Sequence, residues 1–326
     1  MRKKIAIAAG GDSGEYEVSV NSARVVYENL DQSVYEPYII MMKDRNWYCE
    51  LNGRTYEIDK NDFSLRTEKD IIHFDGVFIA IHGTPGEDGK LQGYFEMIKM
   101  PYSTSNWITS ALTFDKTFCK DLVAKWGVVV PKSIVIKKGA DYDPGMPGSE
   151  IGIPCFVKPN KGGSSVGTTW VRKQEDLGPA IELSFREDDE TLVEEYIQGT
   201  EITCGVMRIK DELFVLPITE IVSKTEFFDY EAKYTTGMAD EITPARIDEA
   251  TEIECKRLSA FLYNQLNCRG VCRFDYIFNQ KAMYFLEVNT VPGLSANSIV
   301  PQQAENMGIS LPEFFNMLIE DMLARQ

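Results

Sequence analysis

Two carboxylates and a guanidinium fall at matching positions of two strand-like segments near the end of the chain, residues 271–278 and 283–289. Side chains of a strand alternate between its faces, so Arg273 and Asp275 share one face of the first segment. Glu287 and Asn289 share one face of the second segment in the same way. An antiparallel pairing that sets Asp275 opposite Glu287 also sets Arg273 opposite Asn289. This register would gather two carboxylates, an amide oxygen and a guanidinium on one surface.

Such a cluster suits a divalent cation. Its strand neighbours are apolar or aromatic: Phe274, Tyr276, Phe285, Leu286 and Val288. Unpaired carboxylates in that setting would be costly and would repel each other. Mg2+ prefers oxygen ligands of this kind, usually together with a phosphate. Two solvated strand carboxylates are the simpler alternative. The following residues lead to Ser298 and predict a helix start, which is a site where anions bind.

The composition is ordinary for a soluble globular protein, with 44% hydrophobic and 26% charged residues. The 326 residues suit two or three compact units. The net charge of −16 argues against nucleic acid or an anionic membrane as a partner, although a local basic pocket could still bind phosphates. No apolar run is long enough to span a bilayer.

Cysteine and histidine usage indicates a reducing compartment and disfavours a zinc site. The seven cysteines are scattered, with Cys268 and Cys272 the only close pair, and His73 and His82 are the only histidines. The apolar part of the N-terminus is too short for a secretion signal, so we interpret it as a first strand. An odd cysteine count without an export signal is typical of the cytoplasm, where we expect this protein to act.

The first third of the chain predicts a domain of repeating strands and helices that ends near residue 104. A strand at 4–9, a Gly-rich turn at 10–15 and a helix at 18–30 form a unit typical of nucleotide-type α/β folds. The turn matches neither the dinucleotide nor the P-loop fingerprint. Glu15 lies at the mouth of this turn, where open α/β sheets bind ligands. A glutamate that offsets the helix dipole is the alternative.

A second Gly-rich loop, at 82–89, follows a buried strand at 76–81. It begins with His82, which is a candidate ligand-binding residue at that place, with a structural histidine as the alternative. A helix at 92–99 and a short strand from residue 100 follow. The polar stretch at 47–65 is compatible with a hairpin.

The middle of the chain contains two features that could bind phosphate. A strand at 154–159 carries Lys158 among apolar residues, and lysines are seldom buried without a partner. The Gly-Ser segment 160–167 exposes successive backbone N–H groups that could wrap a phosphate, with a flexible hairpin as the alternative. An amphipathic helix at 115–125 precedes both, a Pro/Gly-rich loop is expected at 141–150, and a helix at 175–185 follows.

The last third predicts strands at 191–197 and 202–209, a long helix at 247–266 and a closing helix at 311–324. Residues 223–241 are long and polar for a connection, which is typical of a lid or a binding loop. Lys233 and Tyr234 lie within this predicted lid.

Eight segments in order resemble the D-alanine–D-alanine ligases of the ATP-grasp superfamily: GGDSGEYEVS, FIAIHGTPGEDGKLQG, DK at 115–116, FVKPNKGGSSVG, VEEYIQGTE, DYEAKY, GVCRFDY and EVNTVPGLSANSIVP. The ordered series, rather than any single segment, is specific. It implies an α/β, three-domain ATP-grasp fold with an N-terminal Rossmann-like (pre-ATP-grasp) domain. The implied domains are 1–104, 105–194 and 195–326, the last with the metal site and the lid. The family pattern differs at 103–106 and at 47–66, where no assigned residue lies.

The resemblance also implies roles for individual residues. ATP would lie between the central and C-terminal domains, bound by phosphate, adenine and ribose contacts: Lys116, Lys158, Gly163, Ser165, Val166, Glu194, Ile197, Glu201 and Lys233. Two Mg2+ ions, with Mn2+ as a substitute, would bind Asp275, Glu287 and Asn289. The first D-alanine would be oriented by a triad of Glu15, Ser164 and Tyr234, with His82 nearby. Ser298 and Ile299 would contact the second D-alanine, and Arg273 with the Gly293 N–H would form an oxyanion hole.

The implied reaction joins two D-alanine molecules through a D-alanyl phosphate, giving ADP, phosphate and D-alanyl-D-alanine for peptidoglycan precursors. A D-alanine–D-lactate or D-alanine–D-serine ligase is a close alternative. Lactate-using relatives lack the lid tyrosine that Tyr234 supplies, whereas D-serine is less easily excluded. Another carboxylate–amine ligase, or a nucleotide-binding regulatory protein without activity, is disfavoured by the EAKY segment and by the complete metal set. The resemblance also implies a homodimer.

Overall fold

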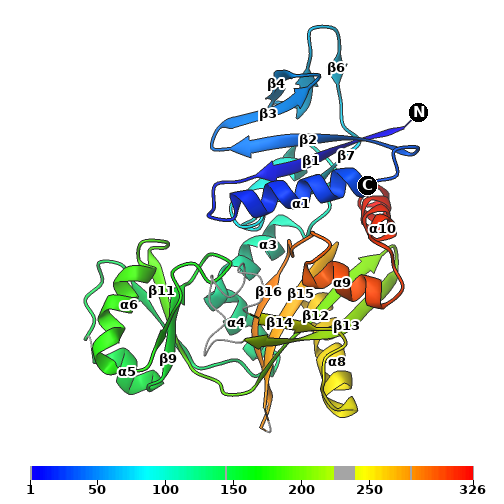
Figure 1. Cartoon of the computed structure of the whole chain (residues 1–326). Helices are drawn as coiled ribbons and strands as arrows, with labels where there is room; N and C mark the ends of the chain where they lie inside the picture. Colours follow the sequence, from blue (N-terminus) through cyan, green and yellow to red (C-terminus); the bar gives the residue numbers. More distant parts are fainter. Residues whose placement is uncertain (1, 144, 224–238, 280, 326) are drawn as a thin grey trace.

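The computed structural model describes residues 2–143, 145–223, 239–279 and 281–325, and contains three β-sheets with helices packed on them (Figure 1). The predicted α/β class is confirmed. Figure 1 shows the first sheet and helix α1 at one end of the molecule and the other two sheets at the opposite end. In the described part of the chain, no helix has both the length and the apolar character needed to cross a membrane.

The first sheet has seven strands in the order β6-β5-β4-β3-β2-β1-β7. Its parallel part consists of β1 (Lys3–Gly10), β2 (Tyr35–Lys43) and β7 (Gly76–Ile79), with α1 (Tyr16–Asn29) between β1 and β2. The polar stretch compatible with a hairpin forms antiparallel strands that widen this sheet, β3 (Asn46–Leu51), β4 (Arg54–Asp59) and β5 (Ser64–Arg66). A fourth antiparallel strand, β6 (Ile71–Ile72), follows that stretch. Helix α2 (Lys90–Met97) follows. The short strand predicted from residue 100 is wrong, since only an isolated bridge joins Tyr102 to Val77.

The second sheet has four antiparallel strands in the order β10-β9-β11-β8. They are β8 (Ser133–Lys137), β9 (Cys155–Pro159), β10 (Thr169–Val171) and β11 (Glu190–Glu195). Helix α6 (Leu177–Ser184), preceded by the 3-10 turn η1 (Gln174–Asp176), packs on β9 and β10. The loop predicted at 141–150 is wrong in part, because α5 (Met146–Ile151) begins within it.

The third sheet carries the hairpin predicted to hold the carboxylates. Its order is β14-β13-β12-β15-β16, and its strands are β12 (Thr200–Ile209), β13 (Glu212–Ser223), β14 (Ala239–Ile242), β15 (Val271–Phe278) and β16 (Met283–Asn289). The predicted register is confirmed, with Asp275 opposite Glu287 and Arg273 opposite Asn289. A β-bulge follows, since Tyr276 pairs with Phe285 rather than with Leu286.

Strands occupy both ends of the predicted 223–241 lid, so that connection is shorter than the sequence predicted. Ser223 ends β13, and β14 begins at Ala239. The intervening residues lie outside the described part of the chain.

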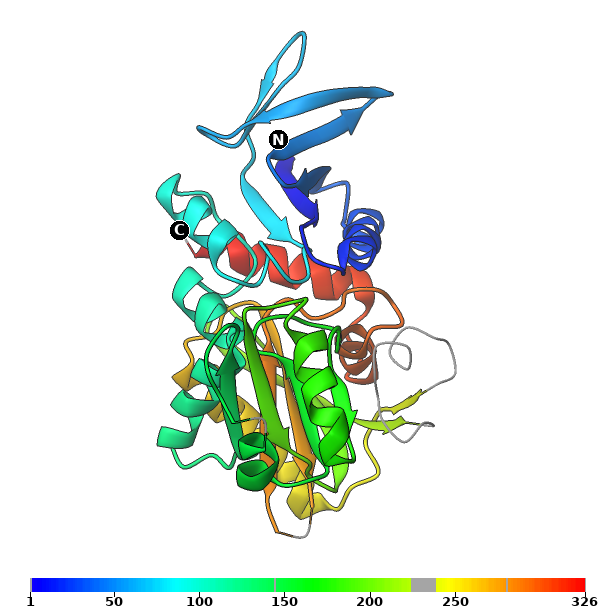
Figure 2. The same ribbon diagram turned by 90° about the vertical axis from the view of Figure 1, so that its left-hand side faces the viewer.

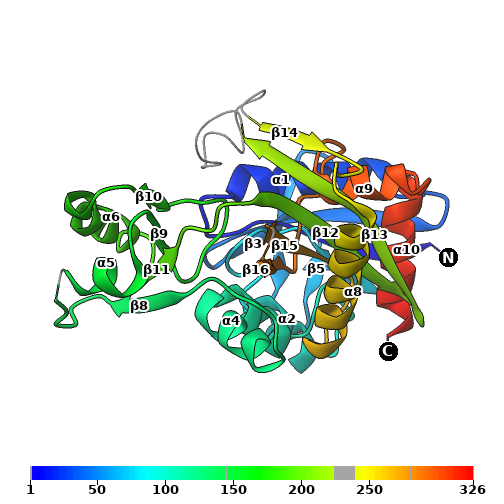
Figure 3. The same cartoon turned by 90° about the horizontal axis from the view of Figure 1, so that it is seen from below.

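Apolar side chains of the third sheet and of α8 (Glu249–Gln265) form one core, which leaves the polar side chains of β12, β15 and β16 on the other face. Figure 3 shows α8 along this sheet. Helices α3 (Trp107–Phe114) and α4 (Lys116–Lys125) also contact β16. Helix α4 begins after the cap residue Asp115, whose side chain accepts a hydrogen bond from the Phe118 N–H at 3.0 Å. Helix α3 was not predicted.

The first sheet shares a hydrophobic core with the two last helices, α9 (Ile299–Asn306) and α10 (Leu311–Ala324). Ile7 and Phe78 of the sheet pack with Phe315 and Ile319 of α10, and the rings of Phe78 and Phe315 meet edge to face at 6.0 Å. Figure 2 shows α10 running beneath the first sheet. The two ends of the chain therefore stabilise each other, and the predicted domain boundaries remain a prediction.

Candidate active site

One large cavity, of about 890 Å3, is lined by strands and loops of the second and third sheets and by α1 and loops that adjoin the first sheet. Every predicted site residue that the structure describes lines it. Lys233 and Tyr234 lie outside the described residues, so their roles remain predictions.

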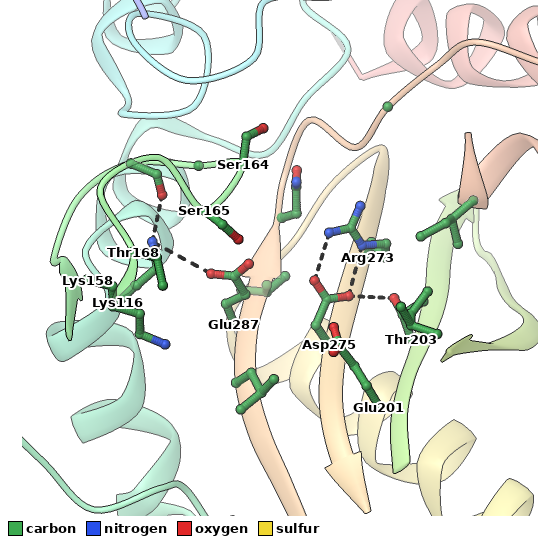
Figure 4. Close-up of a pocket in the computed structure, with 18 of the residues that line it drawn as sticks. Lys116, Lys158, Ser164, Ser165, Thr168, Glu201, Thr203, Arg273, Asp275 and Glu287 are labelled. Atoms are coloured by element: carbon green, nitrogen blue, oxygen red, sulfur yellow. Dashed lines mark hydrogen bonds and ion pairs between the residues drawn. The ribbon is translucent and has the colours of Figure 1, made fainter. Parts of the chain in front are cut away.

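Asp275 is held by two neighbours at the centre of the cavity wall (Figure 4). The Arg273 guanidinium donates through Nε and Nη2 to the two carboxylate oxygens, at 2.8 and 2.7 Å. Thr203, which lies opposite Asp275 on β12, donates its hydroxyl at 2.5 Å. Asp275 is therefore charge-balanced and hydrogen-bonded by the protein itself, which removes most of the cost expected for a buried carboxylate.

Glu287 forms an ion pair with a lysine side chain. Lys116, in the first turn of α4, lies with Nζ 3.6 Å from the Glu287 carboxylate and also donates to the Gly162 carbonyl at 2.6 Å. Figure 4 shows this lysine between the Gly-Ser loop and the strand that carries Glu287. One side chain thus connects α4, the loop and the third sheet, and brings a positive charge to the cavity.

The oxygen donors of Asp275, Glu287 and Asn289 fit a hard divalent cation. The Asn289 amide oxygen accepts one hydrogen bond, from the Val291 N–H at 3.1 Å, and a second lone pair remains on that oxygen. Among the described residues no three His, Cys, Asp or Glu side chains form a metal cluster. Two carboxylates and one amide are therefore an incomplete ligand set, which phosphate oxygens and water would complete.

The Gly-Ser loop docks on the first sheet through Glu15. The Ser164 hydroxyl donates to the Glu15 carboxylate, so two members of the predicted triad are in contact. A Cβ at Gly163 would come within 2.7 Å of the Glu15 carboxylate, so only glycine permits this approach. Ser164 and Ser165 have left-handed backbone conformations, with φ of +52° and +58°. Both serines and Val166 line the cavity.

His82 is buried, and both nitrogens of its ring have a hydrogen-bond partner. Its Nδ1 lies 2.8 Å from the Val291 carbonyl, which can only accept, so Nδ1 carries the proton. Nε2 then accepts from the Ser22 hydroxyl at 2.9 Å. Burial lowers the pKa of His82, which favours this neutral form. His82 therefore connects the first sheet to the loop that follows β16.

Glu87 is a site residue that the sequence reasoning missed. It is 8% exposed, lines the cavity, and accepts hydrogen bonds from the N–H groups of Gly83 at 2.7 Å and Val291 at 3.2 Å. Its place in the Gly-rich loop that begins with His82 was the available signal. Burial and the nearby charge of Glu15 raise the pKa of Glu87 to about 8.

Replacing Glu87 by Gln should lower the free energy of unfolding by about 1–3 kcal/mol at pH 5.5, because the amide nitrogen cannot accept from a backbone N–H. The raised pKa favours the protonated carboxyl in the folded state. The contribution of this carboxyl to the free energy of unfolding is complete below pH 4.5 and is lost as the pH rises through about 8. The deficit of Glu87→Gln should therefore shrink by pH 8.5. Urea unfolding at both pH values measures this, with the exposed Glu17→Gln as control; a deficit that grows with pH would contradict it.

The side of the cavity that the sequence predicts to bind the nucleotide contains Ile197, Glu201 and Glu194, with Phe156, Ile277 and Leu286 as apolar walls. Glu194 is 3% exposed, and its carboxylate accepts from Lys158 at 2.6 Å. A flat apolar ring with polar edges would match this combination of walls and carboxylates.

The start of α9 forms another edge of the cavity. Ser298 is the residue that precedes the helix, and its hydroxyl lies 2.8 Å from that of Ser295. A Cβ at Gly293 would come within 2.7 Å of the Ser298 hydroxyl, so the two segments approach closely. Ile299 is the first helical residue and also lines the cavity. N–H groups at a helix start favour an anion such as a carboxylate.

Two family models cover most of the chain. Residues 4–105 match the D-ala D-ala ligase N-terminus and residues 122–320 match the D-ala D-ala ligase C-terminus. A D-alanine–D-alanine ligase of Phocaeicola vulgatus is 44% identical over 323 residues, covering 98% of this chain and 99% of that protein. A second, of Parabacteroides distasonis, is 44% identical over 327 residues and covers 99% and 98%.

Solved structures give the same result. The VanG D-Ala:D-Ser ligase of Enterococcus faecalis has a TM-score of 0.86 at 34% identity, over 99% of this chain and 100% of that chain. The D-alanine–D-alanine ligase of Bacillus anthracis complexed with ATP has a TM-score of 0.79 at 30% identity, over 99% and 98%. The ATP-grasp fold implied by the sequence is confirmed. The chain therefore belongs to the D-alanine–D-alanine ligase family.

Proposed function

We propose that this protein joins two D-alanine molecules to D-alanyl-D-alanine at the cost of one ATP, for the synthesis of peptidoglycan precursors. The observation that carries the proposal is the cavity, because every described residue implied by the resemblance lines it. The curated relatives of 41–44% identity, which cover nearly the whole chain, are D-alanine–D-alanine ligases and support the same substrate. A cytoplasmic homodimer remains a prediction.

The chemistry requires an activated carboxylate. The carboxylate of the first D-alanine would attack the γ-phosphoryl group of ATP, releasing ADP and leaving a D-alanyl phosphate. Lys116 and Lys158, which both reach the cavity, would bind the phosphates, and Glu15 with Ser164 would orient the first substrate. Mg2+ held by Asp275, Glu287 and Asn289 would supply charge neutralisation for the phosphoryl group.

The second half of the reaction forms the peptide bond. The amine of the second D-alanine would attack the acyl carbonyl and release phosphate. Arg273 and the Gly293 N–H would donate to the oxyanion, while Ser298 at the start of α9 would bind the acceptor carboxylate. A closed cavity would protect the acyl phosphate from water, which would be the purpose of the lid predicted between β13 and β14.

D-serine is the competing acceptor, because the VanG D-Ala:D-Ser ligase has the same fold at 34% identity. Phosphate release with ATP and D-alanine, and then with D-serine or D-lactate added, tests the proposal.

We expect D-alanyl-D-alanine as the main product at pH 8, since the acceptor must arrive as a free amine. D-lactate use should be negligible at neutral pH and rise as the pH falls, because the competing amine becomes protonated. Mass spectrometry of the products from pH 6 to pH 9 measures this, and predominant D-alanyl-D-serine or D-alanyl-D-lactate at pH 8 would overturn the proposed acceptor.

A further inference from the structure

The carboxylate of Glu194 lies between two lysines, one on each oxygen. Lys158 of β9 donates to Oε1 at 2.6 Å, and Lys120 of α4 forms an ion pair with Oε2. Glu194 is the ion-pair partner of Lys120 within the described part of the chain. Lys120 comes one helical turn after Lys116, so both lysines lie on the same face of α4.

The two lysines differ in their access to the cavity. Lys158 lines the cavity and its side chain is 16% exposed, whereas Lys120 is 3% exposed and is not a lining residue of the described cavity. Burial, together with the nearby ammonium groups of Lys158 and Lys116, lowers the pKa of Lys120. The ammonium form is favoured by the carboxylates around it, which are Glu194 in direct contact and Glu287 farther away.

A nucleotide would compete for only one of these contacts. Its phosphates can reach Lys158, which faces the cavity, but they cannot reach a side chain that is enclosed. If Lys158 turned to a phosphate, Glu194 would lose one of its two counter-charges while remaining buried. A buried carboxylate without a cation takes up a proton, because its charged form is poorly solvated.

We propose that Lys120 is a positioning residue that keeps Glu194 ionised when nucleotide phosphates draw Lys158 away from it. The inference rests on the proposed use of ATP. Release of Lys158 leaves Oε1 as an acceptor that faces the cavity, where the exocyclic amino group of adenine can donate to it. The Lys158–Glu194 contact thereby couples recognition of the phosphates to recognition of the adenine. Because Lys120 stays beside Glu194, Lys158 can move to a phosphate without Glu194 taking up a proton.

The test is proton uptake on ATP binding in Lys120→Met. Isothermal titration calorimetry with ATP and Mg2+, without D-alanine, is run in two buffers of different ionisation enthalpy between pH 7.5 and pH 9. The wild type should bind ATP without proton uptake from this group. Lys120→Met should take up one proton, so its Kd for ATP should rise by up to about tenfold per pH unit. Lys120→Arg should restore the wild-type behaviour.

Two further variants separate this role from a structural one. Lys125→Met removes an exposed lysine of the same helix and should bind ATP as the wild type does. Lys158→Met leaves Glu194 with Lys120 alone, so it should bind ATP more weakly but without proton uptake, and it tests the proposal even where Lys120→Met does not fold. Proton uptake by Lys158→Met, or none by a folded Lys120→Met, would overturn the inference. A wild type that does not bind ATP would instead refute the proposed function.

Discussion

Replacing Glu287 by Gln is expected to reduce turnover by about 100-fold or more and to leave the fold intact. The amide keeps the shape of the side chain but removes the charge that balances Lys116, 3.6 Å away, and that would bind Mg2+. A metal ion contributes several kcal/mol to charge stabilisation in reactions of this kind, and each 1.36 kcal/mol is about tenfold in rate. Phosphate release at saturating Mg2+ measures turnover, and thermal unfolding checks the fold.

Glu212→Gln is the matched control, since Glu212 is an exposed glutamate of the same sheet. It should retain wild-type turnover. Near-normal turnover of Glu287→Gln at saturating Mg2+ would remove Glu287 from the metal site and leave it a structural role, which includes its contact with Lys116.

Replacing Arg273 by Lys should lower kcat by about 10²–10³, the usual loss when an oxyanion donor is removed. Lysine keeps the positive charge but cannot reproduce the two parallel hydrogen bonds that the guanidinium makes to Asp275 at 2.8 and 2.7 Å. The Kd for ATP should change much less than kcat, because the lost interaction belongs to the acyl-transfer step.

Single-turnover kinetics distinguishes the steps. Formation of ADP should be less affected than formation of the dipeptide, and Arg257→Lys, an exposed position on α8, serves as control. An equal loss in ADP formation would show that Arg273 acts by holding Asp275 rather than by stabilising the oxyanion.

The hairpin of β15 and β16 could be predicted because alternation alone fixes which side chains share a face. The position of Asp275 opposite Glu287 follows from that rule and from the short turn. The bulge after Asp275 could not be predicted, since nothing local marks Leu286 as the extra residue. The bulge allows both Tyr276 and Phe285 to enter the core while Leu286 lines the cavity.

Contacts between segments that lie far apart in the chain could not be predicted from the sequence. Thr203 became a partner of Asp275 only because β12 pairs with β15, and strand neighbours far apart in the chain have no local signature. Lys120 is similar, since its position one turn after Lys116 predicts a shared helix face but not the buried glutamate of β11 that it meets. The Gly-Ser loop was predicted as a phosphate-binding segment, whereas its contact with Glu15 was implied only by the family resemblance.

The shared core of the first sheet and α10 has a consequence for how the chain folds as it leaves the ribosome. Ile7 and Phe78 are synthesised long before Phe315 and Ile319, the α10 residues that share their core. Helix α1 covers part of this apolar face with Ala23 and Val26, but the part that α10 covers stays open until that helix has been made. Such a delayed, long-range closure slows folding and exposes the nascent protein to aggregation. Chaperones that shield apolar surface should act on this protein until α10 has left the ribosome.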